Sequence, residues 1–159
     1  MEQIVIKGET KEEIYSELLP QIKSLIADEP DLIANLANVT SALKQAFPSF
    51  SWVGFYLMKG NELVLGPFQG KLACTRIKIG SGVCGTSALE KKTIIVPDVE
   101  KFPGHIYCDP DSKSEIVVPI IKDGEVLGVL DIDSYELNNF DEVDKVYLEK
   151  IVDLLVSKF

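Results

Sequence analysis

The sequence predicts an α+β domain with a largely antiparallel central sheet flanked by N-terminal and C-terminal helices. Three observations support this class. Two segments with helical spacing precede the first strands, residues 115–133 are typical of a β-hairpin, and an amphipathic helix closes the chain. With 159 residues and an apolar fraction of 46%, the chain can bury one core but is short for two, so we expect a single domain over residues 1–159.

The net charge and the N-terminal segment bear on partners and location. A formal charge of −9 argues against a nucleic-acid or anionic-membrane surface, because both need clustered Lys and Arg. No apolar run approaches the ~20 residues of a membrane span. The first residues lack the basic and apolar regions of a signal peptide. We therefore expect a cytoplasmic protein that binds neither nucleic acid nor membrane.

The first helix is expected directly after a short strand-like segment over residues 1–9. Thr10 and Glu13 match a capping box, in which each side chain bonds the other residue's backbone N–H. Pro20 lies inside the helical pattern and should kink or split the helix, because proline lacks a backbone N–H. The apolar positions that define this helix are Ile14, Leu18, Ile22, Leu25 and Ile26.

A second helix is expected to begin at Pro30 and to end before Pro48. Near the C-terminus, Asn139–Glu142 should cap the closing helix. The first strand contains Trp52 and Phe55, which are most simply core residues, although an aromatic wall for a small ligand is an alternative. The strands before the hairpin are predicted over residues 52–58, 63–65, 75–79 and 93–96, with a loop over residues 66–73.

A glycine-rich turn lies between two of these strands. Gly80, Gly82 and Gly85 spell G-x-G-x-x-G, the dinucleotide-binding fingerprint, ahead of a helix expected over residues 87–91. That helix is too short for a βαβ crossover, so we favour glycines that shape a tight turn. The turn also places Cys84 near a helix N-terminus, where the helix dipole lowers a thiol pKa.

The hairpin carries acidic residues on an otherwise apolar pair of strands. Glu115 starts the first strand, and Asp131 and Asp133 end the second. Residues two apart on a strand share a face, so both aspartates point the same way. Carboxylates in such surroundings are costly unless a cation or a proton satisfies them. The alternative is that they are strand-end carboxylates bonded to neighbouring backbone.

The loop length of the hairpin decides whether Glu115 joins the aspartates. A two-residue loop, Asp123-Gly124, would set Glu115 opposite Ile132 and on the wrong face. A three-residue loop that includes Lys122 sets Glu115 opposite Asp131 and makes the other face wholly apolar. The pattern therefore favours the three-residue loop with a bulge at its left-handed glycine.

The three cysteines, Cys74, Cys84 and Cys108, lie in loops or at element ends rather than inside apolar runs. Buried small hydrophobes are the simplest interpretation of any one of them. Cys108 lies in a long loop over residues 97–114, and such loops are usually functional or mobile. His105 with the three cysteines could form a zinc site, but no C-x-x-C spacing supports one. A hydrogen-bonded or solvated loop histidine is the simpler interpretation.

A cysteine facing a carboxylate cluster suggests a thiol site that binds something cationic. Several motifs of this chain resemble those of the free methionine-(R)-sulfoxide reductases, which are single GAF domains, so the resemblance implies a GAF-like fold. They are SWVGFY at residues 51–56, GSGVCGT at 80–86, VPDV at 96–99, HIYCD at 105–109 and GVLDIDS at 128–134. Residues 138–142, NNFDE, also resemble the Asn-Lys-Phe-Asp-Glu motif of cyclic-nucleotide GAF domains. Asn139 replaces the lysine, so we expect its ion pair to be absent and do not expect a nucleotide site.

The resemblance implies a role for each cysteine. Cys108 would be the catalytic cysteine, Cys74 the main resolving cysteine and Cys84 an auxiliary one. The residues that match the family's substrate-binding side chains are Trp52, Glu115, Asp131 and Asp133.

The implied reaction is thiol-dependent reduction of free L-methionine-(R)-sulfoxide through a cysteine sulfenic acid and an intramolecular disulfide. It needs no metal or bound cofactor, and a thioredoxin/NADPH system would act as the external reductant. A homodimer through terminal helices is also implied by the GAF resemblance. A ligand-sensing or redox-sensing GAF module without catalysis is the alternative.

Overall fold

The computed structural model describes residues 3–159 and contains four α-helices around one six-stranded sheet. The strand order is β3-β2-β1-β6-β5-β4, and each neighbouring pair is antiparallel, which confirms the predicted α+β class. The elements are α1 (Lys11–Ala27), α2 (Leu32–Ala46), β1 (Trp52–Lys59), β2 (Glu62–Gln69), β3 (Arg76–Lys78), α3 (Gly82–Glu90), β4 (Ile94–Val96), the 3₁₀-helix η1 (Val99–Lys101), β5 (Ser114–Lys122), β6 (Glu125–Ser134) and α4 (Glu142–Val156).

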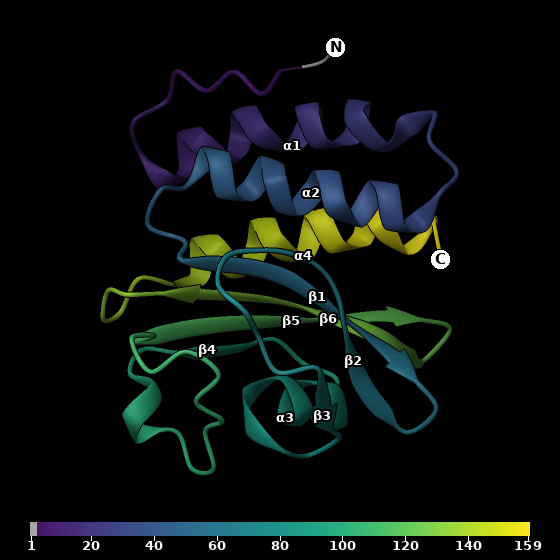
Figure 1. Cartoon of the computed structure of the whole chain (residues 1–159). Coiled ribbons are helices and arrows are strands. Elements are labelled where there is room, and N and C mark those ends of the chain that lie inside the picture. The colour runs from purple at the N-terminus through teal and green to yellow at the C-terminus, as the bar shows by residue number, and fades with distance from the viewer. Residues whose placement is uncertain (1–2) are drawn as a thin grey trace.

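The two faces of the sheet are covered differently. Helices α1, α2 and α4 lie over one face, whereas α3 and the long connection between β4 and β5 lie on the other (Figure 1). Side chains alternate between the faces along each strand. On β1, Val53 and Phe55 belong to the apolar core under the three helices, and Trp52 and Tyr56 belong to the cluster on the α3 face. The α3 face is therefore where polar side chains can gather without disturbing the main core.

The N-terminal helix begins at the predicted capping box and continues through its proline. Thr10 and Glu13 bond each other's backbone N–H groups, which confirms the cap. Pro20 does not split α1, and the side-chain amide of Gln21 donates to the Glu17 carbonyl at 2.8 Å in the turn that the proline weakens. Residues 3–9 form no strand, so that expectation is wrong there, and residues 1–2 lie outside the described part of the chain.

The second helix begins two residues later than predicted. Asp31 is its N-cap and accepts a hydrogen bond from the backbone N–H of Ala34 at 2.9 Å, so Pro30 precedes the cap. The closing helix has Asp141 as its N-cap, within the predicted segment. Lys11 of α1 lies 3.4 Å from Asp141, so this aspartate has a lysine partner even though residue 139 is asparagine.

Strand β2 and helix α3 both extend further than the sequence pattern indicated. Strand β2 continues to Gln69, through the predicted loop, with a register irregularity in its pairing with β1. Helix α3 begins at Gly82, five residues before the predicted start, so Cys84 lies in its first turn. The glycines do shape this turn: Gly82 has a φ of 61°, and a Cβ at Gly85 would collide with the Lys78 carbonyl.

The β5–β6 hairpin has a two-residue loop, so the predicted three-residue loop is wrong. Asp123 and Gly124 have φ values of 52° and 79°, and Lys122 pairs with Glu125. Positive φ at both loop positions is the geometry whose twist matches that of two paired strands, which favours this turn over the longer loop.

A β-bulge in β6 places Glu115 on the predicted face of the sheet in spite of the shorter loop. The register shifts by one residue near Leu127 of β6, so Glu115 lies opposite Asp133 rather than the predicted Asp131. The two partners differ by two positions, and residues two apart share a face. The predicted face of Glu115 is therefore right although its partner is wrong.

Among residues 3–159, no helix is both long enough and apolar enough to cross a membrane.

Candidate active site

Three acidic side chains share the sheet face that lies opposite helices α1, α2 and α4. Glu115 pairs with Asp133 across β5 and β6, while Trp52 of β1 pairs with Asp133 on the other side. Asp131 is two positions from Asp133 and lies opposite Gly54. Only glycine fits at position 54, because a Cβ on that residue would collide with the indole of Trp52. The three central strands thus place three carboxyl groups and one indole together.

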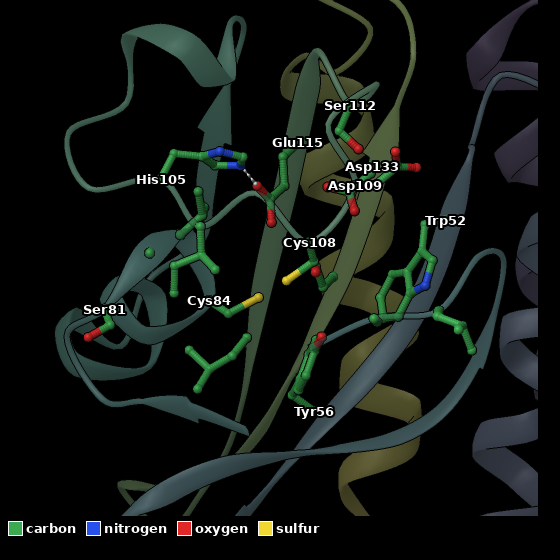
Figure 2. A pocket seen from close by; sticks show the side chains of 17 residues that line it. Trp52, Tyr56, Ser81, Cys84, His105, Cys108, Asp109, Ser112, Glu115 and Asp133 are labelled. Carbon is green, nitrogen blue, oxygen red and sulfur yellow. Dashed lines mark ion pairs between the residues drawn. The ribbon is translucent and has the colours of Figure 1, made fainter. Parts of the chain in front are cut away.

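These side chains line a pocket that α3 and the loop between β4 and β5 close from the side. About 40 Å³ is open to the centres of water-sized spheres, and one water needs roughly 10–15 Å³ on that measure. The sulfurs of Cys84 and Cys108 point into the space between Glu115 and Tyr56 (Figure 2). The pocket therefore brings sulfur atoms and carboxyl groups to one small volume.

Two of the three cysteines form a disulfide at the pocket. Cys74 and Cys108 are bonded, with their Cα atoms 5.6 Å apart, although 34 residues separate them in sequence. Cys108 is exposed and Cys74 is partly exposed, so a reductant can reach this bond from solvent. Both sulfurs are bonded to each other, so the four-ligand zinc set of three cysteines and His105 is not available in this form.

Cys84 remains a free thiol and is buried, with 4% of its surface exposed. Burial, followed by the nearby Asp131 and Glu115, raises the pKa of this thiol well above its ordinary value. The expected lowering by the dipole of α3 is thus wrong, because burial and the negative neighbours outweigh the helix. Cys84, Glu115 and Asp131 each offer one ligand atom within 4.8 Å of the others, a spacing that could also accept a cation.

The carboxyl groups are held under conditions that favour their protonated forms. Burial and the charge of Asp133 raise the pKa of Glu115 to about 8. Burial and Glu115 raise the pKa of Asp131 well above its ordinary range, and burial and Asp131 do the same for Asp133. Oδ1 of Asp131 is buried and has no hydrogen-bond partner among the described residues. The cluster therefore suits a ligand that brings both a positive charge and a group able to take a proton.

Two aromatic residues of β1 hold the loop that carries Cys74. The indole Nε1–H of Trp52 donates to the Lys71 carbonyl at 3.1 Å, and the Tyr56 hydroxyl donates to the Cys74 carbonyl at 3.0 Å. The ring of Trp52 stacks on that of Phe68 with centroids 5.3 Å apart. Trp52 thus lines the pocket as the alternative interpretation expected, whereas Phe55 is fully buried in the core.

Residues of the Cys108 loop also line the pocket, and sequence reasoning assigned them no role there. His105 Nε2 lies 3.3 Å from Oε2 of Glu115, and both side chains are 7% exposed. Of the two forms of the favoured interpretation, the contact fits a histidine with a bonding partner rather than a solvated one. Asp109 accepts a hydrogen bond from the Tyr135 hydroxyl at 2.7 Å. Their position beside Cys108 in sequence was the only available signal.

Comparisons with known proteins agree with the fold. A family model described as a GAF domain matches residues 28–157. A curated Dictyostelium discoideum protein named GAF domain-containing protein A is 60% identical over 97% of this chain and 98% of its own. The free methionine-R-sulfoxide reductase of Saccharomyces cerevisiae is 50% identical over 91% of this chain and 85% of its own.

A solved structure extends the similarity over the whole chain. It is the X-ray structure of the free methionine-R-sulfoxide reductase of Neisseria meningitidis in complex with its substrate. The two chains are 49% identical, the match covers 100% of this chain and 96% of the other, and the TM-score is 0.98.

Proposed function

Because this chain belongs to the GAF-domain family and, within it, to the free methionine-R-sulfoxide reductases, we propose that it reduces free L-methionine-(R)-sulfoxide to methionine with Cys108 as the nucleophile. The observation that carries this proposal is the Cys74–Cys108 disulfide beside a buried acidic pocket. It is the oxidised state that such a reaction leaves behind.

The acidic cluster is suited to a free amino acid. Glu115, Asp131 and Asp133 surround the pocket, and a substrate ammonium group pairs with those that are ionised. A methionine sulfoxide inside a polypeptide has no such ammonium group, so the buried cluster favours the free amino acid. Trp52 provides an apolar wall against which the methyl group of the substrate packs.

The first chemical step transfers the sulfoxide oxygen to Cys108. A protonated carboxyl of the cluster, with Glu115 the best candidate, gives its proton to the sulfoxide oxygen. The Cys108 thiolate attacks the sulfur of the protonated sulfoxide and forms an S–S bond with it. The hydroxyl group then moves from the substrate sulfur to the cysteine sulfur, which breaks both the substrate S–O bond and the new S–S bond. Methionine leaves with two more electrons than the sulfoxide had, and the hydroxyl stays on Cys108 as a sulfenic acid.

The second step closes the disulfide and releases water. The Cys74 thiol attacks the sulfenic sulfur of Cys108, and the hydroxyl leaves as water. Cys84 is buried with a raised pKa, so it is the less ready thiol and serves as an auxiliary. A thioredoxin-type dithiol, reduced by NADPH through its reductase, then returns both cysteines to thiols by exchange at the exposed disulfide. Such a system implies a reducing compartment, and we propose the cytoplasm.

The decisive assay is NADPH consumption with thioredoxin and thioredoxin reductase. Free L-methionine-(R)-sulfoxide, its S epimer and an N-acylated sulfoxide are compared, with Cys108→Ser as the matched inactive control. We expect consumption with the free R epimer alone. Absence of consumption with every sulfoxide, with folded protein and reduced cysteines, would refute the proposal and favour a sensor module.

Dimer formation stays a prediction from the family resemblance. Analytical ultracentrifugation of the reduced and oxidised protein tests it, and a single monomeric species would contradict it.

A further inference from the structure

His105 is a pocket residue to which the proposed chemistry assigns no part. It is the single histidine of the chain, and its side chain is 7% exposed. Nε2 lies 3.3 Å from Oε2 of Glu115, the contact drawn as a dashed line in Figure 2. On the other side of the ring, Nδ1 is buried and has no hydrogen-bond partner among residues 3–159. Within the described part of the chain, the one ion-pair contact of this imidazole is with Glu115, so its role is best sought at that carboxyl.

The electrostatics of the pair favour a neutral imidazole beside a protonated carboxyl near neutral pH. Burial lowers the pKa of His105, and burial together with Asp133 raises that of Glu115 to about 8. A neutral imidazole donates from one nitrogen and accepts at the other. With its proton on Nε2 it donates to Oε2, so Oε2 is the carbonyl oxygen and the carboxyl proton resides on Oε1. If the imidazole proton were on Nδ1, Nε2 would instead accept the carboxyl proton of Glu115, and the buried Nδ1–H would have no acceptor.

We propose that His105 is a positioning residue of this reductase, whose Nε2–H holds Oε2 of Glu115 and thereby directs the carboxyl proton of Glu115 to the sulfoxide oxygen. The inference rests on the proposed function. His105 lies three positions before Cys108 in the same loop, so the contact also ties the segment bearing the nucleophile to β5. One residue thus couples the position of the attacking sulfur to that of the proton donor.

The pocket holds other groups that titrate, and the experiment must separate them from this pair. Tyr107 packs edge-on against the His105 ring with centroids 4.5 Å apart. The remaining titratable groups around the pocket come from β1, α3, the Cys108 loop and β6, and they are Tyr56, Cys84, Asp109, Asp131 and Asp133.

The first test is a nuclear magnetic resonance titration of the His105 ring, which a chain with one histidine makes unambiguous. We expect nitrogen chemical shifts of a neutral ring protonated on Nε2. We also expect an inflection near the pKa of about 8 of Glu115, and Glu115→Gln should remove it. A proton on Nδ1, or a titration that Glu115→Gln leaves unchanged, would overturn the inference. This test needs no turnover and no variant of His105.

The second test is a double-mutant cycle on the single-turnover rate. We expect His105→Ala and Glu115→Gln each to slow the reaction by about 10- to 100-fold, and the double variant to be no slower than Glu115→Gln alone. His105→Gln retains a side-chain N–H and should restore the rate to within about fivefold of the unaltered enzyme. Losses that multiply in the double variant would mean that His105 does not act through Glu115.

Two further readouts separate positioning from packing. Loss of the Nε2–H should move the alkaline limb of the pH–rate profile upward in His105→Ala, because the ionised carboxyl loses a donor. Tyr107→Ala removes the ring contact but not the donor, and we expect it to keep the original profile. If Tyr107→Ala slows the reaction as much as His105→Ala does, His105 has only a packing role. If the unaltered protein reduces no sulfoxide, the proposed function fails, and the titration still decides the His105–Glu115 pairing.

Discussion

Replacement of Glu115 by Gln should make the free energy of unfolding of the oxidised protein less dependent on pH. Glu115 is 5% exposed and lies among two other carboxyl groups whose pKa values are also raised. Its folded-state pKa of about 8 lies above its ordinary value of 4.5. Between these values the folded protein binds a proton that the unfolded chain has released, so the free energy of unfolding must fall as pH rises.

The size of the effect follows from the same two values. A difference from 4.5 to about 8, at about 1.4 kcal/mol per pH unit, gives an upper limit of about 5 kcal/mol. This stabilisation is fully present below pH 4.5 and lost as pH rises through about 8. Asp131 and Asp133 share protons with Glu115, so we expect Glu115→Gln to remove at least about 2 kcal/mol of the pH dependence.

Urea unfolding followed by circular dichroism, at about pH 5 and about pH 8 without reductant, measures this difference. Glu100→Gln is the matched control, because Glu100 is exposed on η1. We expect Glu115→Gln to be more stable than the unaltered protein at the higher pH, and the control to match the unaltered protein throughout. If Glu115→Gln and the unaltered protein lose the same stability between the two pH values, the argument that burial raises this pKa is wrong.

Three other substitutions test separate parts of the molecule. Cys74→Ala should retain one turnover but stop recycling, with a sulfenic acid on Cys108 that a 1,3-diketone traps; normal recycling that instead depends on Cys84 would reverse the assignment of the resolving cysteine. Tyr56→Phe removes the 3.0 Å bond to the Cys74 carbonyl and should slow disulfide closure by about 3- to 10-fold, with formation of the sulfenic acid unchanged in rapid-quench experiments; equal slowing of both steps would contradict this. Asp144→Ala leaves the buried Tyr15 hydroxyl without its acceptor, while Lys11 keeps Asp141 and the Asn139 carbonyl; it should cost about 2 kcal/mol in urea unfolding, with unchanged turnover per folded molecule.

Features that depend on neighbouring residues could be predicted from the sequence. The capping box of Thr10 and Glu13 requires side chains three residues apart, and the structure contains it. The shared face of Asp131 and Asp133 is equally local, because residues two apart on one strand point the same way, and both line the pocket. Pro20 shows the limit of this approach, because tertiary packing of α1 against α2 and α4 stabilises a helix that its own sequence would interrupt.

The hairpin shows why a face is easier to predict than a register. Apolar alternation fixes which side each residue takes, but it cannot detect an extra residue such as Leu127. The incorrect loop length and the unpredicted bulge together moved the partner of Glu115 by two positions. Because this shift is even, the expected group of three carboxyls survived the error.

The long-range pairings of the pocket could not be read from spacing. The bond between Cys74 and Cys108 depends on how two loops, separated by 34 residues, meet over β1 and β5. The contact of His105 with Glu115 likewise depends on the path of the Cys108 loop. No local pattern specifies a loop path, so only resemblance to a family suggested the first pairing and nothing suggested the second.

The division of the sheet into two faces explains how this fold can hold so costly a site. The apolar face packs under three helices and supplies the stability, so the other face can carry Glu115 and Asp131 in burial that disfavours their ionised forms. In the proposed mechanism, a ligand ammonium group would relieve that cost when it binds, whereas a neutral ligand of the same shape would not. Substrate selection and proton donation would then both come from one arrangement, three carboxyl groups too crowded to ionise together.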